Sequence, residues 1–112
     1  MSFVDPVPFE TAENIAVTIT AMSGVAGLWG GFYGEIALLY PSHRITGMRL
    51  IENDTVGTGL EIDIVADLDT LPATQTVKTL SEAIRIMAEK ESGLATNVIV
   101  ADVVAQQPIT QG

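Results

Sequence analysis

The chain contains no cysteine, which excludes disulfide bonds and thiolate chemistry and fits a reducing compartment. Positive charge is also scarce, because 5 lysines and arginines stand against 14 acidic residues and give a formal net charge of −9. The field of such a molecule repels phosphate backbones and anionic lipid headgroups. We therefore expect no direct binding to nucleic acid or to a membrane surface.

Long apolar runs are missing as well. The longest, Ile36–Leu39 and Val98–Ala101, fall far short of the roughly 20 residues that cross a bilayer. The N-terminal segment shows neither the basic region nor the apolar stretch of a secretory signal. We expect no membrane insertion and a cytoplasmic location.

Apolar residues are nevertheless abundant, at 47% of the 112 residues, and this content favours a folded chain of one domain. Pro6 and Pro8 fix the backbone of the first residues and discourage regular pairing there. The sequence predicts an extended N-terminal arm over residues 1–8, a single domain over residues 9–105 and a loose tail over residues 106–112.

Two segments carry apolar residues at helical spacing. The first starts at Thr11 and is expected to end near Ser23, where Gly24 supplies a stop. The second follows residues 69–74, carries apolar residues at this spacing from Val77 to Ala88, and is stopped by Ser92-Gly93. Both patterns predict amphipathic helices with one buried face.

Four other segments read as strands. Ile36–Tyr40 and Ile45–Glu52 flank a polar turn and are predicted to pair as a hairpin. Leu60–Asp67 alternates apolar with acidic residues, which predicts one wet face. Ala95–Val104 is apolar on both faces, a composition typical of a central strand.

The resulting order is α-β-β-β-α-β, and it predicts an α+β fold with two helices on one face of a mixed three- or four-stranded sheet. The last strand, helix and strand should form a right-handed crossover between parallel strands. The opposite sheet face, with Glu61, Asp63 and Asp67, is then expected to meet solvent or a partner.

Candidate chemistry is sparse. The only histidine, His43, lies in a polar turn with no nucleophile and carboxylate arranged around it by local spacing. Asp69 adds a further carboxylate to the acidic strand, but the spacing matches no calcium-binding loop, and a solvated strand face explains these side chains. The glycines between Gly24 and Gly34 follow a helix rather than a strand and lack the lysine of a phosphate-binding loop. We predict no catalytic residue, no cofactor and no specific metal ion.

The same glycine-rich segment holds three of the chain's aromatic residues, Trp29, Phe32 and Tyr33. Aromatic side chains on a loop are frequent anchors of protein interfaces, and they also serve to fill cores. Both interpretations stay open from the sequence. With Glu61, Asp63 and Asp67, these aromatics form the candidate protein interface.

Several segments resemble those of the alkaline shock protein family. Ser23–Leu28 resembles the family's "P-G-V-x-x-L" helix end, and Arg44–Leu50 resembles its "R-V-x-G-V-x-V" strand. Leu60–Asp67 is similar to its strand with interspersed acidic residues, and Ser92–Val103 resembles its "T-G-L-x-V-x-x-V-x-V-x-D-V" ending. The similarity extends from about Thr11 to Val104, with serine at position 23 where proline is common and no basic C-terminal tail.

The resemblance implies a bacterial, cytoplasmic, non-enzymatic protein linked to envelope or alkaline stress. It also implies self-association and, as in some members, recruitment to the inner face of the membrane by a separate anchor protein. We therefore expect a scaffold or adaptor that acts through homo-oligomers and protein contacts. The alternative is an accessory domain that binds a small ligand or a divalent metal through the acidic strand and a cavity between helix and sheet.

Overall fold

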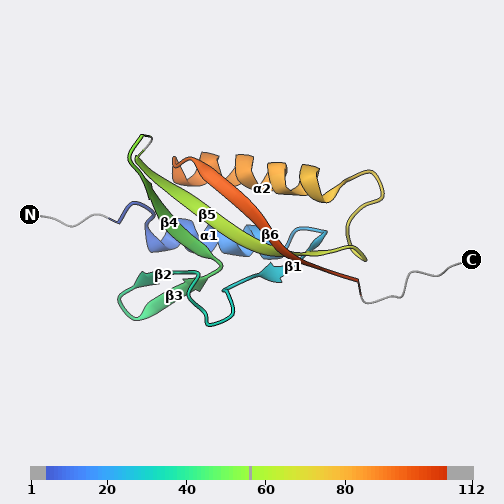
Figure 1. Cartoon of the computed structure of the whole chain (residues 1–112), viewed down its shortest axis with the longest axis horizontal. Helices are drawn as coiled ribbons and strands as arrows, with labels where there is room; N and C mark the ends of the chain where they lie inside the picture. Colours follow the sequence, from blue (N-terminus) through green and yellow to red (C-terminus); the bar gives the residue numbers. More distant parts are fainter. Residues whose placement is uncertain (1–4, 56, 106–112) are drawn as a thin grey trace, which may run out of the picture.

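The structure is a computed structural model, and it describes residues 5–55 and 57–105 (Figure 1). The helices and strands follow one another along the chain in this order: α1 (Phe9–Thr20), β1 (Val25–Leu28), β2 (Ala37–Tyr40), β3 (His43–Thr46), β4 (Met48–Asn53), β5 (Gly57–Asp67), α2 (Val77–Ser92) and β6 (Thr96–Val104). Residues 1–4 of the expected arm and the expected tail at 106–112 lie outside the described residues.

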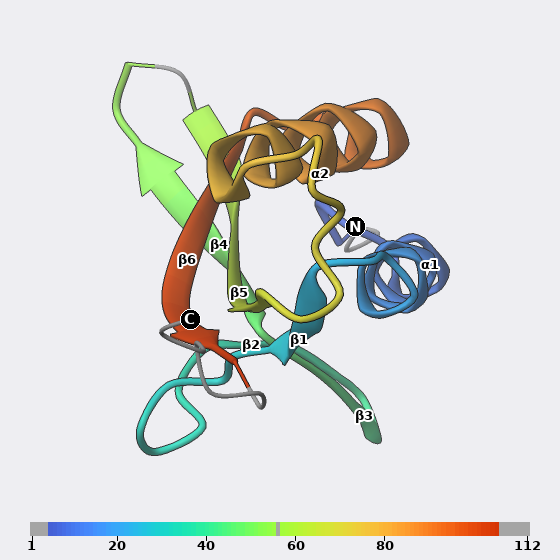
Figure 2. The ribbon, with the colours of Figure 1, turned by 90° about the vertical axis from the view of Figure 1, so that its right-hand side faces the viewer.

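Both helices cover the same face of the main sheet, as the end-on view in Figure 2 shows. This confirms the α+β prediction, and the end of α2 at Ser92 matches the predicted stop. The buried residues of the two helices recur at helical spacing, and they are Ala12, Ile15, Ile19, Leu80, Ile84 and Ala88. Within the described ranges, neither helix combines the length and the apolar character needed to span a membrane.

The main sheet has four strands and is organised around β5. β6 runs parallel to β5 along one edge, whereas β1 and β4 both run antiparallel along the other edge. β4 pairs with the first half of β5 and β1 with the second half, so the two short strands lie end to end. The sequence did not predict β1, which is four residues long, contains a glycine and has an irregular register next to Val25.

The predicted strand Ile45–Glu52 is wrong as a single strand, because the chain changes partners at Gly47. The part before Gly47 is β3, which pairs with β2 in a separate two-stranded sheet, and the part after it is β4, which pairs with β5. Gly47 has a φ of +90°, and a β-carbon there would lie 2.6 Å from the Cβ of Leu28. Only glycine fits this crossing of the chain over the end of β1.

The predicted central position of β6 is also wrong. Among the described residues β6 pairs with β5 alone, and it therefore forms an edge of the sheet. Its inward side chains, such as Val98 and Val100, pack against the core under α2. The apolar composition that suggested two neighbouring strands is present, but residues 5–55 and 57–105 supply only one of them.

Candidate functional site

The six residues of the candidate interface separate into two groups in the structure. Glu61, Asp63 and Asp67 lie on β5, with side chains on the face away from the helices, which we call the outer face. The aromatic residues belong to the connection between β1 and β2, residues 29–36, which we call the aromatic loop. In Figure 2 this loop projects at the lower left, on the outer side of the sheet.

Glu61 is buried, with 4% of its surface exposed, although the alternating pattern predicted a wet face. Arg49 of β4 stands directly opposite it in the antiparallel register. The guanidinium donates from Nε to Glu61 Oε2 at 2.9 Å and from Nη2 to Oε1 at 3.3 Å. This two-bonded contact raises the pKa of the Arg49 guanidinium and gives the buried carboxylate a compensating charge.

Asp63, two residues further along β5, is 3% exposed, so the prediction of a solvent-exposed face is wrong for this residue as well. It lies where β1 ends and β4 begins: its N–H donates to Gly47 O at 2.9 Å and its carbonyl accepts from Trp29 N at 2.9 Å. In the parallel register its neighbour on β6 is Ile99. The reason for the burial of both acids is that β5 has strands on both edges, a fact that alternation within one strand does not reveal.

The surroundings of Asp63 disfavour its charged form. Gly47 brings no side chain, Ile99 is apolar, and the Asp63 Oδ1 atom is buried without a hydrogen-bond partner within the described part of the chain. Burial raises the pKa of Asp63 to about 7, and the neighbouring Glu61 carboxyl adds to the increase, whereas Arg49 acts in the opposite direction. Asp63 therefore keeps its proton to a higher pH than an ordinary aspartate, and it does so beside an ion pair.

Asp67 does not join this pair. It is half-buried at the end of β5, where its Oδ1 accepts from Asp69 N at 2.9 Å and its own N–H donates to Gly24 O at 2.8 Å. The first bond shapes the turn after β5, and the second joins the end of β5 to the residue before β1. The structure therefore brings together Glu61, Asp63 and Arg49, and sequence reasoning missed Arg49 because only the pairing of β4 with β5 places it there.

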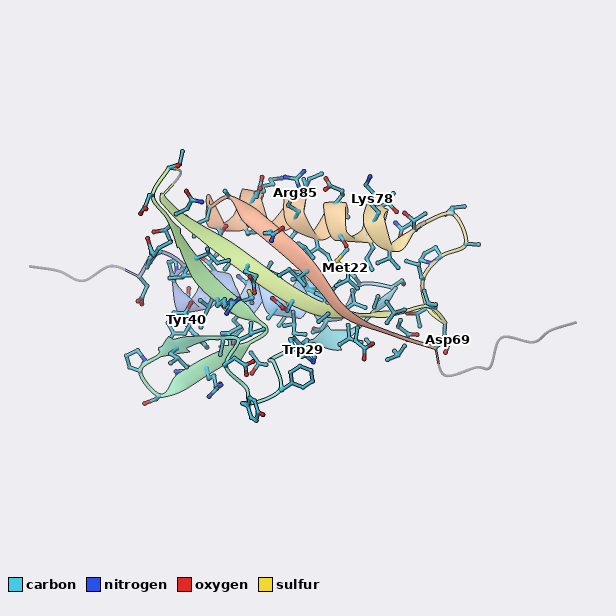
Figure 3. All side chains as sticks on the ribbon, viewed as in Figure 1. Met22, Trp29, Tyr40, Asp69, Lys78 and Arg85 are labelled. Carbon is cyan, nitrogen blue, oxygen red and sulfur yellow. The ribbon has the colours of Figure 1, made fainter. Side chains whose placement is uncertain are left out.

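The aromatic loop exposes two of its three rings. Trp29 is half-buried (Figure 3), and its ring meets that of Phe32 edge to face with centroids 5.3 Å apart. Phe32 is 86% exposed and Tyr33 is 94% exposed. The sequence left burial of the aromatics open, and the structure shows Trp29 as the base of the loop and the other two rings as its outer surface.

Hydrogen bonds close this loop. Tyr33 N donates to Glu35 Oε2 at 2.9 Å, and Ile36 N donates to Gly30 O at 2.9 Å across the loop's base. Arg44 of β3 donates from Nη2 to Gly34 O. The pKa of Glu35 is lowered because backbone N–H groups bind its carboxylate. Phe32 and Tyr33 are consequently presented by a fixed backbone.

His43 lies apart from both groups, at the start of β3. It is exposed, its Nδ1 is 3.1 Å from Pro41 O, and its ring lies 4.4 Å from that of Phe9. Over residues 5–55 and 57–105, no group of three or more histidine and acidic side chains is placed to hold a metal ion.

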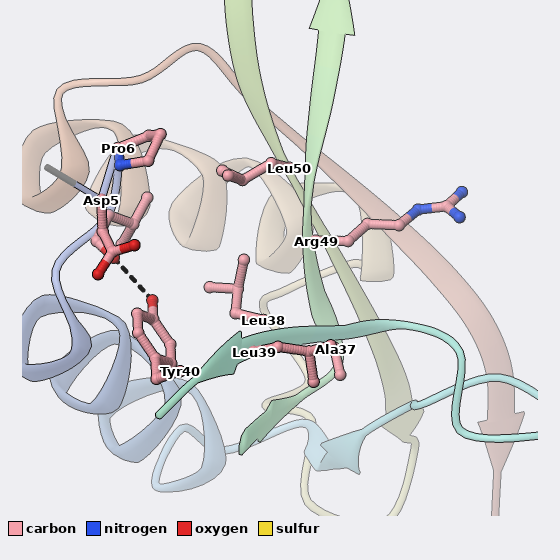
Figure 4. A pocket seen from close by; sticks show the side chains of 9 residues that line it. Asp5, Pro6, Ala37, Leu38, Leu39, Tyr40, Arg49 and Leu50 are labelled. Carbon is pink, nitrogen blue, oxygen red and sulfur yellow. Dashed lines mark hydrogen bonds between the residues drawn. The ribbon is translucent and has the colours of Figure 1, made fainter. Parts of the chain in front are cut away.

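A pocket of about 240 Å³ opens between the segment before α1 and strands β2 and β4 (Figure 4). Its wall includes Tyr40, whose hydroxyl donates to Val7 O at 2.7 Å and whose pKa is raised by burial. Arg49 contributes its stem, while its guanidinium points away from the pocket. Among the residues that line the pocket, Asp5 is therefore the one whose charged group lies at its edge.

Comparisons with family models, with curated proteins and with solved structures find no match to this chain. Membership of the alkaline shock protein family therefore stays a prediction from the sequence segments described above.

Proposed function

We propose that this protein is a non-catalytic scaffold or adaptor that works by self-association and by contacts with other proteins. The observation that carries the proposal is the aromatic loop, which holds Phe32 and Tyr33 almost fully exposed on a hydrogen-bonded backbone. Monomeric proteins expose single apolar residues routinely, but two adjacent aromatic rings on a braced loop are a typical interface anchor.

The ordered backbone of the aromatic loop favours a role of its aromatic side chains in binding a partner. An aromatic side chain has few rotatable bonds, so it loses little conformational entropy when a partner covers it. The backbone bonds at Tyr33 and Ile36 remove most of the cost of ordering the loop itself. A partner would therefore gain apolar contact area at low entropic cost.

The resemblance to alkaline shock proteins extends this proposal to a physiological setting. It supports a bacterial role in envelope or alkaline stress, with a membrane-anchored protein as one candidate partner. The net charge of −9 makes a protein anchor the more favourable route to a membrane than direct contact with anionic lipids.

The alternative of a metal- or ligand-binding domain has less support. Glu61 and Asp63 are buried, and the guanidinium of Arg49 already occupies the Glu61 carboxylate and repels a cation. The pocket beside Tyr40 falls below the roughly 300 Å³ at which small-molecule sites begin. It also lies between strands and the segment before α1, not between a helix and the sheet as predicted.

The double variant Phe32→Ser/Tyr33→Ser tests the proposal. We expect it to lower the average molar mass measured by light scattering across a concentration series, since the loop no longer offers an apolar anchor. The matched control is Val17→Ser/Ile86→Ser, which removes two exposed apolar side chains from the helices and should leave the mass unchanged. Thermal stability close to that of the wild type in both variants shows that folding is intact.

A wild-type chain that remains strictly monomeric at high concentration would contradict self-association. An oligomer whose mass is unaffected by the loop variant would contradict the role of the aromatic loop.

A further inference from the structure

The free edge of β6 has backbone groups that the described chain leaves without strand partners. Leu60 N donates to Ala95 O at 2.8 Å, and in a parallel pair every second residue of a strand faces its neighbour. The N–H and C=O groups of Val98 and Val100 therefore point away from β5. Among the described residues no other strand pairs with this edge.

Side chains close both ends of this free edge. Glu89 of α2 accepts from Thr96 N at 3.0 Å, and Asp102 accepts from Val103 N at 2.8 Å. The register with β5 also shifts just before Asp102, which interrupts the regular strand geometry there. Four groups remain open in the centre, the N–H and C=O of the two valines on either side of Ile99.

We propose that a second copy of this chain pairs with this edge, β6 against β6 in antiparallel orientation about a twofold axis at Ile99. This inference rests on the proposed self-association and identifies one of its contacts. In this register Val98 faces Val100 of the second copy, so each of these pairs exchanges two hydrogen bonds and the four central groups of each copy are satisfied. The two four-stranded sheets become one continuous sheet.

The composition of the edge supports this occupant. Residues 96–101 carry no charge and no proline, the devices that usually protect an edge strand from pairing. β6 has the two-sided apolar composition of a central strand, and pairing would give it that position. Ile99, which is 37% exposed on the outer face, would meet Ile99 of the second copy across the axis.

Charges on α2 also favour this arrangement, because they meet opposite charges on α2 of the second copy. Helical spacing places Lys78, Glu82, Arg85 and Glu89 in one stripe, and the bond from Thr96 to Glu89 shows that this stripe lies beside the free edge. A twofold axis at Ile99 sets the two α2 helices antiparallel and alongside each other. The alternating stripe then places Glu82 near Arg85 of the second copy and Lys78 near its Glu89.

Within one copy, the Arg85 guanidinium forms ion pairs with two acids of its own helix. Its Nη2 lies 2.8 Å from Glu82 Oε2, and its Nη1 lies 3.2 Å from Glu89 Oε2. These groups are partly exposed on a surface of net negative charge, so nearby negative charges of a second copy would oppose association unless they met positive ones. The antiparallel stripe provides this match.

The principal test is Ile99→Lys, measured by sedimentation equilibrium of the full chain. Two lysines would face each other at the axis, and we expect the dissociation constant of the dimer to rise by about 100-fold or more. Ile86→Lys, at a 58% exposed position on α2, is the matched control and should leave the dimer intact. Circular dichroism of both variants checks the fold.

A second test uses the charge stripe. Arg85→Glu places like charges together at two symmetric contacts and should weaken the dimer by about tenfold. Adding Glu82→Lys restores opposite charges across the axis, so the double variant should recover the wild-type dissociation constant. Because this swap also restores the pair between positions 82 and 85 within one helix, an equimolar mixture of the single variants Arg85→Glu and Glu82→Lys is the control. Their heterodimer places opposite charges at both contacts between copies while each helix keeps like charges at positions 82 and 85, so its recovery reports the contact between copies alone.

The outcomes separate the two proposals. A wild-type chain that is monomeric at all concentrations overturns both. A wild-type oligomer that Ile99→Lys leaves unchanged overturns only the β6 contact, and so does a double charge variant that stays as weak as Arg85→Glu.

Discussion

Replacing Asp63 with asparagine is expected to raise the free energy of unfolding by about 2 kcal/mol at about pH 8 and to change it little at about pH 4. The pKa of Asp63 is about 7 in the folded chain, against 3.8 for the ordinary group. Between these values the folded state holds a proton that the unfolded state has released. Stability therefore falls as pH rises through this interval, and the full penalty is present above about pH 7.

Asparagine has the shape of the protonated acid and stays neutral, and its amide can donate a hydrogen bond toward Glu61. The variant should thus lose the pH-dependent penalty that Asp63 imposes. Urea unfolding of the wild type and the variant across this pH range measures the difference directly.

The control for the loss of one negative charge is Asp54→Asn, at an exposed position after β4. This control is needed because the chain carries a net charge of −9, so removing any one negative charge reduces repulsion within the folded chain. If the unfolding free energies of wild type and Asp63→Asn follow parallel curves with pH, the folded chain does not hold the Asp63 proton, and the assignment fails.

Gly47→Ala is expected to lower the free energy of unfolding by about 3 kcal/mol or more. The new β-carbon would lie 2.6 Å from Leu28 Cβ, and alanine would also be forced to a φ of +90°. Relief requires the start of β4 to move away from the end of β1. That movement would strain the hydrogen bond from Asp63 N to Gly47 O, which joins the start of β4 to β5.

Gly93→Ala separates the two causes of this loss. Gly93 ends α2 with a φ of +74°, but a β-carbon there meets nothing within 4 Å. This control therefore reports the backbone strain alone, and we expect it to cost about 1 kcal/mol. Chemical denaturation of the two variants and the wild type gives the comparison, and equal losses at both glycines would contradict a steric role of Gly47.

The sequence was informative where the relevant physics is local. The second helix was predicted with its observed end at Ser92, because the apolar spacing marks its buried face and Ser92-Gly93 marks its end. The inward row of β5, from Leu60 to Ala66, followed from simple alternation. In each case the pattern lies within one element, so no neighbour is needed to interpret it.

Short strands were less predictable. β1 has four residues and an irregular register, and its glycine and small side chains gave the appearance of a turn. The division of the next predicted strand at Gly47 depends on the proximity of Leu28, which is 19 positions away in the chain. A contact between distant residues leaves no local periodicity.

The sequence by itself determined the fold class, the two amphipathic helices and the strongly negative net charge, since these follow from composition and local spacing. Tertiary structure alone decided that Glu61 and Asp63 are buried with Arg49, that Phe32 and Tyr33 are exposed, and that β6 forms an edge. The physical reason is that burial of a strand residue depends on which strands lie beside it. Pairing joins segments far apart in sequence, and only the folded chain brings them together.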